Sequence, residues 1–143
     1  TVVVLKNGDP TIFGRGIQIC KEAKKQGVEC LVIPGVSAFA AAAALYQVEI
    51  TDGAELRHVA LLSYPHFNAE ILASIKADTV VVYMMGDRIT EVLDVAGKIC
   101  DPAAEVFICH SVSRGGGCVK LGATPLADVK KPVLIIIKRC FKQ

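Results

Sequence analysis

Short apolar runs of strand length alternate with stretches of helical periodicity, and this alternation constrains the fold more than any other feature of the sequence. The runs lie at residues 2–5, 28–33, 58–63, 79–84, 106–110, 118–121 and 133–138. Between several of them, apolar residues recur three or four positions apart, as on one face of a helix, at residues 13–26, 38–46, 68–77 and after Gly86. Strands alternating with helices predict an α/β fold with a largely parallel sheet, and a glycine-rich turn at residues 114–117 predicts a late hairpin.

A change in composition at Thr51-Asp52-Gly53 marks the best candidate for a boundary between lobes. We predict two small α/β lobes with mostly parallel sheets, a partial N-terminal lobe at residues 1–50 and a C-terminal lobe at residues 51–143. Both strand candidates of the first lobe are apolar throughout, as in strands that are covered on both faces. We therefore expect this lobe to need cover from a partner subunit, a preceding segment or an exchanged element.

Length, composition and charge exclude several classes of protein. The chain has 143 residues and 52% are hydrophobic, which excludes an intrinsically disordered protein. Its longest apolar runs fall far short of the ~20 residues of a membrane-spanning helix. The net charge of +2 is too small to indicate a nucleic-acid partner. With no signal peptide before the first apolar run, we expect a cytoplasmic protein with no membrane partner.

Six cysteines raise the question of a disulfide framework. They form no CxxC pair, and most lie within apolar runs, at positions Cys20, Cys30, Cys100, Cys109, Cys118 and Cys140. Buried free thiols in a reducing compartment are therefore the favoured interpretation, so we expect no disulfide. Cys109 and Cys118 come closest to an exception because they flank one turn. The sequence shows no spacing typical of zinc ligands, so no metal site is predicted.

Two turns, at residues 7–10 and 34–38, come directly after strand candidates and before helices. Open α/β sheets bind ligands at this position. If the two strands are neighbours, both turns face one crevice, which indicates a binding site. The structural alternative for residues 7–10 is a tight turn with a proline at the helix start, because the pattern is neither GxGxxG nor a Walker loop.

Arginines are scarce, and four of them lie beside predicted turns, at Arg15, Arg57, Arg88 and Arg114. A guanidinium at such a place can bind a ligand carboxylate through two parallel hydrogen bonds. An ordinary surface arginine is the alternative interpretation for each of the four.

Four motifs in order resemble those of the tetrapyrrole (corrin/porphyrin) methylase family. Residues 5–16, LKNGDPTIFGRG, resemble the LKGGDPxIFGRG segment of uroporphyrinogen-III C-methyltransferases. The segment VIPGVSA at residues 32–38 resembles the PGVS/T turn of the family. Residues 83–86 resemble its YMG strand end, and residues 121–124 its late GTL turn. The order and spacing match over almost the whole chain.

The resemblance implies an S-adenosylmethionine-dependent C-methyltransferase that acts on a tetrapyrrole, uroporphyrinogen III or a precorrin, in sirohaem or cobalamin biosynthesis. It implies a cofactor cleft between two lobes, with cofactor-binding residues at Gly8, Asp9, Pro10, Ser37, Ala38, Thr51, Met84, Met85, Gly122, Ala123 and Thr124. Asp9 is the implied catalytic residue. Arg15 and Arg114 are the implied clamps for the substrate's carboxylate arms.

The resemblance further implies a homodimer, or association with the family's N-terminal segment, whose first strand and GxGPG turn have no counterpart in these 143 residues. Asn7 replaces a usual glycine, and Thr51-Asp52-Gly53 replaces a Thr-His-Arg sequence that supplies a cation. One alternative function is a non-catalytic ligand-binding or assembly domain. Another is the branch that methylates ribosomal RNA ribose, against which the Gly-Asp-Pro order and the weak charge speak.

Overall fold

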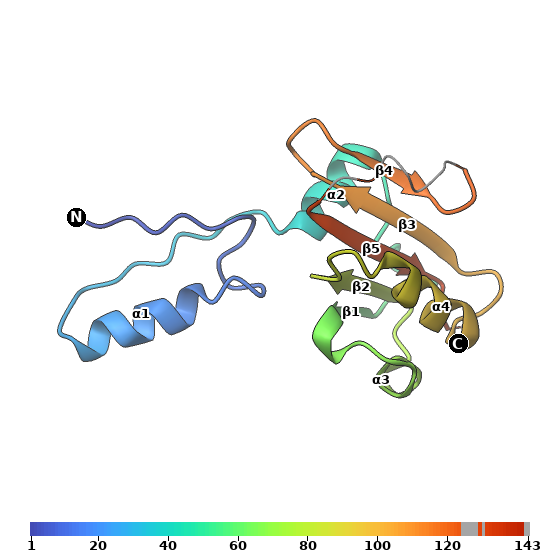
Figure 1. Cartoon of the computed structure of the whole chain (residues 1–143), viewed down its shortest axis with the longest axis horizontal. Helices are drawn as coiled ribbons and strands as arrows, with labels where there is room; N and C mark the ends of the chain where they lie inside the picture. The colour runs from blue at the N-terminus through green and yellow to red at the C-terminus, as the bar shows by residue number, and fades with distance from the viewer. Residues whose placement is uncertain (124–128, 130, 142–143) are drawn as a thin grey trace. The chain divides into compact units, whose positions relative to one another are not determined.

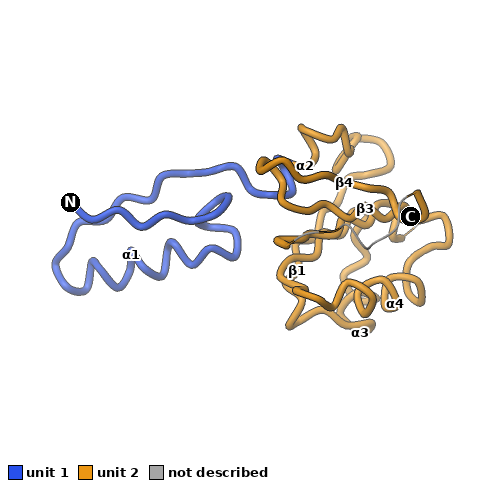
Figure 2. The backbone as a smooth tube through the Cα atoms, turned by 45° about the horizontal axis from the view of Figure 1, so that its top comes forward, with its two compact units in different colours: residues 1–41 blue, residues 42–143 orange. Residues whose placement is uncertain are grey.

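A computed structural model of the chain describes residues 1–123, 129 and 131–141. The chain divides into two compact units, residues 1–41 and residues 42–143 (Figure 2). Helix α2 (Ala38–Tyr46) begins in the first unit and ends in the second. Its bounds match the helix predicted from the alanine-rich sequence, whereas the predicted boundary between residues 50 and 51 stays a prediction.

Unit 1 contains one complete helix, α1 (Gly16–Lys25), whose end is encoded locally (Figure 1). The N–H of Val28 donates to the carbonyl of Ala23, and the N–H of Gly27 donates to that of Lys24, both at 3.0 Å. Gly27 adopts a φ of +72°, which a glycine takes at little cost. This is the Schellman arrangement, so the predicted glycine cap is confirmed.

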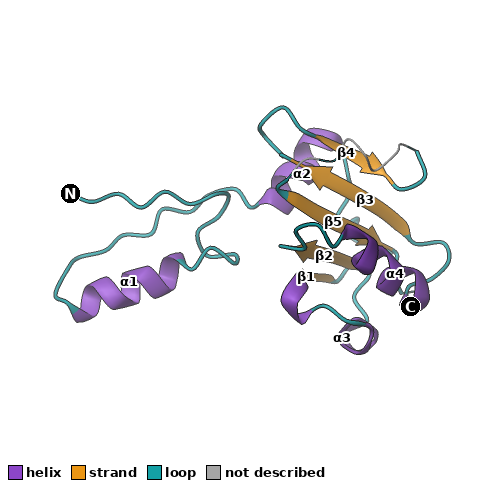
Figure 3. Cartoon of the chain, in the orientation of Figure 1, coloured by secondary structure: helices purple, strands orange, loops and turns teal. Residues whose placement is uncertain are grey.

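The two strands predicted in unit 1 are not formed. Residues 2–5 and 28–33 run as extended chain (Figure 3), yet no described residue of unit 1 belongs to a β-strand. Both segments line a cavity of about 850 Å³, and their aliphatic side chains are exposed, with Val2 at 90% and Leu31 at 83%. An extended segment becomes a strand only when a neighbour supplies hydrogen-bonding partners. The predicted apolar surface is therefore present, but the predicted strands are wrong.

Unit 2 is built on a five-stranded sheet in the order β1-β2-β5-β3-β4 (Figure 3). Its strands are β1 (Val59–Ser63), β2 (Thr79–Tyr83), β3 (Glu105–His110), β4 (Gly117–Lys120) and β5 (Val133–Lys138). The predicted α/β class and the late hairpin are confirmed. The expectation of a mostly parallel sheet is wrong for this unit, because only β1 and β2 pair in parallel. The reason is that β5 inserts antiparallel between β2 and β3.

The strand directions define two edges of this sheet. Tyr83 is aligned with Leu134, and Leu134 is aligned with Cys109, so β1, β2 and β3 all end at the same side, here called the carboxyl edge. Strand β4 runs the other way. It ends near the start of β3, where the N–H of Leu121 donates to the carbonyl of Val106, at what we call the amino edge.

The main core lies between one face of the sheet and two helices, α3 (Ala69–Ile75) and α4 (Ile89–Ile99), which are drawn together in Figure 1. A short 3₁₀ turn, Tyr64–His66, precedes α3. Because alternate strand residues face the same side, one apolar set packs on the helices. It comprises Val80, Val82, Ile108, Ile135 and Ile137 with Leu72, Val92 and Ala96. No described helix combines the length and apolar character that crossing a bilayer requires.

The opposite face of the sheet is also buried. Val81 and Ile136 point to it and have no exposed surface. Thr79 lies on the same face as Val81, and its hydroxyl donates to the carbonyl of Ile50 at 2.8 Å. The segment that follows α2 therefore contacts this second face at the start of β2.

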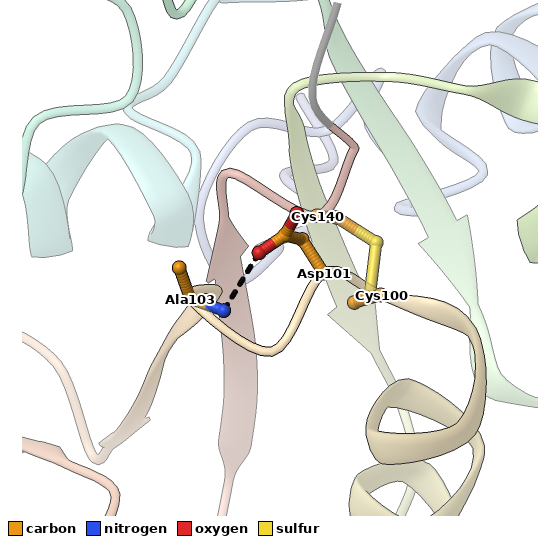
Figure 4. Close-up of a disulfide and its surroundings, with 4 residues drawn as sticks. All are labelled: Cys100, Asp101, Ala103 and Cys140. Atoms are coloured by element: carbon orange, nitrogen blue, oxygen red, sulfur yellow. Dashed lines mark hydrogen bonds between the residues drawn. A yellow bond between two sulfur atoms is a disulfide. The ribbon is translucent and has the colours of Figure 1, made fainter.

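The expectation of free thiols is wrong, because the six cysteines form three disulfides, Cys20–Cys30, Cys100–Cys140 and Cys109–Cys118. Tertiary structure brings together cysteines that are distant in sequence. Sheet register places Cys109 opposite Cys118. Cys100 directly follows α4, and Cys140 lies just after β5. The N–H of Asp101 donates to the carbonyl of Cys140 there. Figure 4 shows this disulfide beside the Asp101 carboxylate, which accepts a hydrogen bond from the Ala103 N–H.

Candidate functional site

Unit 1 brings the two predicted turns, residues 7–10 and 34–38, into direct contact. Oδ2 of Asp9 accepts a hydrogen bond from the backbone N–H of Gly35 at 3.0 Å. Oδ1 of the same carboxylate accepts from the N–H of Thr11 at 2.7 Å and from its hydroxyl. One side chain therefore stabilises the first turn and joins it to the second, so the two turns meet as expected, whereas the binding site inferred from their meeting stays a prediction.

The two turns also touch through their backbones. A Cβ added to Gly35 would lie 2.4 Å from the carbonyl oxygen of Gly8. Gly8 has a φ of +67°, and a Cβ there would lie 3.4 Å from the carbonyl oxygen of Val36. Since real Cβ atoms do not approach a backbone oxygen to 2.4 Å, only glycine at position 35 allows this packing. Glycine at positions 8 and 35 therefore lets the two turns pack backbone against backbone, and both residues remain exposed.

Hydrogen bonding keeps Asp9 ionised. The hydroxyl of Thr11, the N–H of Thr11 and the N–H of Gly35 together hold the pKa of the Asp9 carboxyl below its ordinary value. A carboxylate whose oxygens accept from three donors and whose pKa is lowered is a weak general base. This geometry suits a residue that positions two loops more than one that transfers protons, so the catalytic role expected for Asp9 stays a prediction.

Arg15 belongs to the same region of unit 1. It precedes α1 with a φ of 58°, in a loop that folds back on Pro10. The N–H of Gly16 donates to the carbonyl of Pro10 at 2.8 Å, and a Cβ on Gly14 would meet the same oxygen at 2.7 Å. The structure thus groups the predicted site residues of this unit: Gly8, Asp9, Pro10, Arg15, Ser37 and Ala38.

In unit 2, two turns with predicted site residues follow the carboxyl edge. Met84 and Met85 come directly after β2, and Arg114 lies in the turn between β3 and β4. Met84 has a φ of 59° and is 55% exposed, whereas Met85 is 2% exposed and belongs to the core. Of the two methionines, Met84 is therefore the one whose side chain a ligand can touch. Arg114 is exposed.

Three further predicted residues lie away from this edge. Gly122 and Ala123 follow β4 at the amino edge. Thr51 follows Ile50, whose carbonyl is bonded to Thr79 at the same edge. The five-residue length of β2 alone separates the two edges by roughly 13 Å. Unit 2 therefore does not bring these three residues together with Met84 and Arg114. The predicted residue Thr124 lies outside the described residues.

Two residues with structural consequences carried no signal in the sequence. The hydroxyl of Tyr46 donates to the carbonyl of Gly116 at 3.0 Å, 70 positions away. Asp78 is buried, and its Oδ2 accepts from the N–H groups of Arg57 and His58 at 2.9 and 2.8 Å. Each finds its partner only in the folded chain, so no local sequence pattern indicates the contact.

Burial and hydrogen bonding act against each other on Asp78. Burial alone would raise the pKa of its carboxyl. The N–H groups of His58 and Arg57 and the His58 ring, whose Nδ1 lies 3.1 Å from Oδ2, outweigh burial and lower the pKa below its ordinary value. Asp78 is therefore a buried charge that ties the starts of β1 and β2 together. Across the described chain, no three His, Cys, Asp or Glu side chains gather as metal ligands would.

Comparison with known proteins places these motifs in a family. Residues 1–120 match the family model described as Tetrapyrrole (Corrin/Porphyrin) Methylases. A uroporphyrinogen-III C-methyltransferase of Synechocystis is 36% identical over 91 residues, which cover 58% of this chain and 34% of the relative. A precorrin-4 C(11)-methyltransferase of Rhodococcus erythropolis is 30% identical, and the match covers 96% of this chain and 61% of the relative.

A solved structure shows the same fold. It is the uroporphyrin-III C-methyl transferase of Thermus thermophilus complexed with S-adenyl homocysteine. The TM-score is 0.69 at 22% identity, and the match covers 93% of this chain and 63% of that one. The chain therefore spans between about a third and two thirds of the length of these relatives.

Proposed function

Because the chain belongs to the tetrapyrrole (corrin/porphyrin) methylase family, we propose that the whole protein is an S-adenosylmethionine-dependent C-methyltransferase acting on a tetrapyrrole. Uroporphyrinogen III or a precorrin is the proposed substrate, in the sirohaem or cobalamin route. The hydrogen bond between Asp9 and Gly35 carries the proposal, because it joins the two motifs that match the family in unit 1. The names of the Synechocystis and Rhodococcus relatives support the substrate class.

The turns of unit 1 fit the proposed cofactor. S-adenosylmethionine supplies a methyl group on a sulfonium centre. Gly8, in the first turn, is exposed, and main-chain N–H and C=O groups at a surface turn can bind a polar ligand. We propose that Gly8, Ser37 and Ala38 hold the cofactor through these groups, with Asp9 keeping the two turns in register.

The chain's own contribution to methyl transfer is positioning and electrostatics. An electron-rich pyrrole carbon is already a nucleophile, so a strong protein base is not needed. Arg15 in unit 1 and Arg114 in unit 2 are proposed to bind carboxylate arms of the substrate. Met84 is the exposed methionine and stays the predicted cofactor contact of unit 2. Gly122 and Ala123, at the amino edge, are not included in this proposal.

Calorimetry followed by a transfer assay tests the proposal. S-adenosylmethionine is titrated into the protein, and methyl incorporation into uroporphyrinogen III is then measured with labelled cofactor. Binding that Gly35→Ala weakens at least about 10-fold and that the helix variant Gly97→Ala retains would support the proposed site. Binding without transfer by the whole protein would favour the non-catalytic alternative, and absence of binding would contradict the proposal.

Cytoplasmic location and a homodimer are also proposals. The relatives named above include bacterial biosynthetic enzymes, which supports the first. The three disulfides are unusual for a reducing compartment. Thiol counting on protein that is alkylated during cell lysis would therefore show in which compartment it folds.

A further inference from the structure

The turn between β3 and β4, residues 111–116, has an unusual backbone. Ser111 and Ser113 have φ values of 45° and 64°, and Gly115 has 74°. Residues with a side chain seldom occupy this left-handed region, and they persist there only when surrounding contacts hold them. Such backbone conformations cluster at binding and catalytic sites, so the contacts of this turn indicate what it is built for.

The start of the turn is attached to the sheet. The N–H of Ser111 donates to the carbonyl of Pro132 at 2.9 Å, next to the beginning of β5. One residue inside each strand from the turn, the disulfide Cys109–Cys118 bridges β3 and β4. The base of the turn is therefore held by a covalent bond and by a neighbouring segment.

The end of the turn is attached to α2. The hydroxyl of Tyr46, the last residue of that helix, donates to the carbonyl of Gly116 at 3.0 Å. A Cβ on Gly116 would lie only 1.9 Å from the carbonyl oxygen of His110, so the chain folds tightly back at this residue. The half-buried Tyr46 thus fixes the second end of the turn from a helix that is remote in sequence.

Arg114 lies between these two attachments. Its N–H donates to the carbonyl of Ser111 at 2.9 Å, which closes the turn, and the residue is exposed at the carboxyl edge of the sheet. Open α/β sheets present their ligand-binding residues at this edge. An arginine on a rigid loop also loses less conformational freedom on binding than one on a mobile loop.

We propose that the β3–β4 turn is a preorganised carboxylate-binding loop, in which Arg114 contacts the substrate and Tyr46 is a positioning residue that holds the loop through Gly116. This inference rests on the proposed function, because it assigns the loop to the tetrapyrrole. The ligand chemistry follows from the arginine, since a guanidinium matches a carboxylate with two parallel hydrogen bonds. Tyr46 acts only through the shape of the turn.

Binding of uroporphyrin III, a stable porphyrin with eight carboxylates, tests the inference. Its fluorescence is titrated with the 143-residue chain and with the variants Tyr46→Phe, Arg114→Ala and their combination. We expect Tyr46→Phe to weaken binding about 5- to 10-fold, as for a lost neutral hydrogen bond, and Arg114→Ala to weaken it by about 10-fold or more. The double variant should bind no more weakly than Arg114→Ala, because both changes remove the same contact.

The matched control is Tyr64→Phe. The hydroxyl of Tyr64 donates to the side chain of Glu91 and not to a backbone group of the β3–β4 turn. This variant should bind uroporphyrin III like the unmodified chain. Melting temperatures within a few degrees of one another would show that all variants fold.

Three outcomes would overturn the inference. Additive losses in the double variant would show that Tyr46 does not act through Arg114. Unchanged affinity in Arg114→Ala, or an equal loss in Tyr64→Phe, would exclude the turn as the carboxylate site. S-adenosylmethionine binding, measured in the same samples, separates the two proposals: its absence contradicts the proposed function, whereas cofactor binding with unchanged porphyrin affinities contradicts this inference alone.

Discussion

The carboxylate of Asp9 accepts a hydrogen bond from the backbone N–H of Gly35, which lies 26 positions later in the sequence. This contact, 3.0 Å between Oδ2 and N, holds together two turns that each follow an extended apolar segment. It also explains why an aspartate follows Gly8, since the same carboxylate accepts from Thr11 within its own turn. Substitutions at Asp9 and Gly35 can therefore test how the two turns of unit 1 are held together.

Replacing Asp9 should harm ligand binding more than folding. Asp9→Ala removes the contact to Gly35 and leaves α1 unaffected, so we expect a melting temperature within a few degrees of the parent. A displaced cofactor loop can lower turnover on the order of 10²-fold. Methyl-transfer rates and thermal melts on the same samples decide this, with Asp94→Ala, an exposed aspartate of α4, as the control. A large melting loss with normal specific activity would make Asp9 a structural residue only.

Two glycine-to-alanine variants should have different effects: one should weaken ligand binding, and the other should raise the free energy of unfolding. Gly35→Ala places a Cβ 2.4 Å from the Gly8 carbonyl and must push the two turns apart. We expect S-adenosylmethionine affinity to fall at least about 10-fold, as for a misplaced contact. Gly97 lies inside α4 with open space around it, so Gly97→Ala should stabilise the protein by about 0.5–1 kcal/mol. Calorimetry and denaturant titration measure both, and equal affinities for the two variants would contradict the expectation.

Acid should destabilise the protein partly through Asp78. Its pKa is lower in the folded chain than in the unfolded chain, so its contribution to the free energy of unfolding is complete above about pH 3.9. The contribution is lost as the pH falls through the lowered folded value. Asp78→Asn should cost about 1.5–3 kcal/mol at pH 7 and flatten the decline below pH 4, since the charged acceptor is gone. Urea titrations from pH 7 to pH 2 test this, and an unchanged acid slope would exclude the role.

The three disulfides predict no free thiol in denatured, unreduced protein. They also differ in expected effect, because Cys100 and Cys140 are 40 positions apart and Cys109 and Cys118 are 9 apart. On the chain-entropy estimate, the first restricts the unfolded state by about 4 kcal/mol and the second by about 2.7 kcal/mol. Replacing both Cys100 and Cys140 by serine should therefore lower the melting temperature more than replacing both Cys109 and Cys118. Finding six free thiols in denatured protein without reductant would contradict the three disulfides and support the expectation, from the sequence, that no disulfide forms.

Unit 1 should make the chain associate. Val2, Leu5 and Leu31 are 90%, 88% and 83% exposed, which a folded domain normally avoids. We expect sedimentation of the 143-residue chain at tens of micromolar to show species larger than a monomer. Leu5→Glu with Leu31→Glu should reduce association, whereas Leu121→Glu in unit 2 should not. A monodisperse monomer that melts cooperatively would show that the exposed aliphatic side chains of unit 1 do not cause association.

Much of the local structure follows from the sequence because its causes lie within a few residues. The alanine-rich run predicts a helix at residues 38–46, and α2 has these bounds. The run at residues 133–138 predicts β5, and Gly27 predicts the end of α1. The motifs of the family are local in the same sense, so the sequence also indicated the methylase resemblance and the turns that carry it.

Tertiary structure alone decided how these pieces meet. Strand β5 inserts antiparallel between β2 and β3, and its own composition specifies neither neighbour. The pairing of Cys100 with Cys140 follows from where α4 and β5 end. Tyr46 finds Gly116 across 70 positions. In unit 1 the apolar runs form no strands among the described residues, because a strand needs a hydrogen-bonding neighbour that no local pattern can provide.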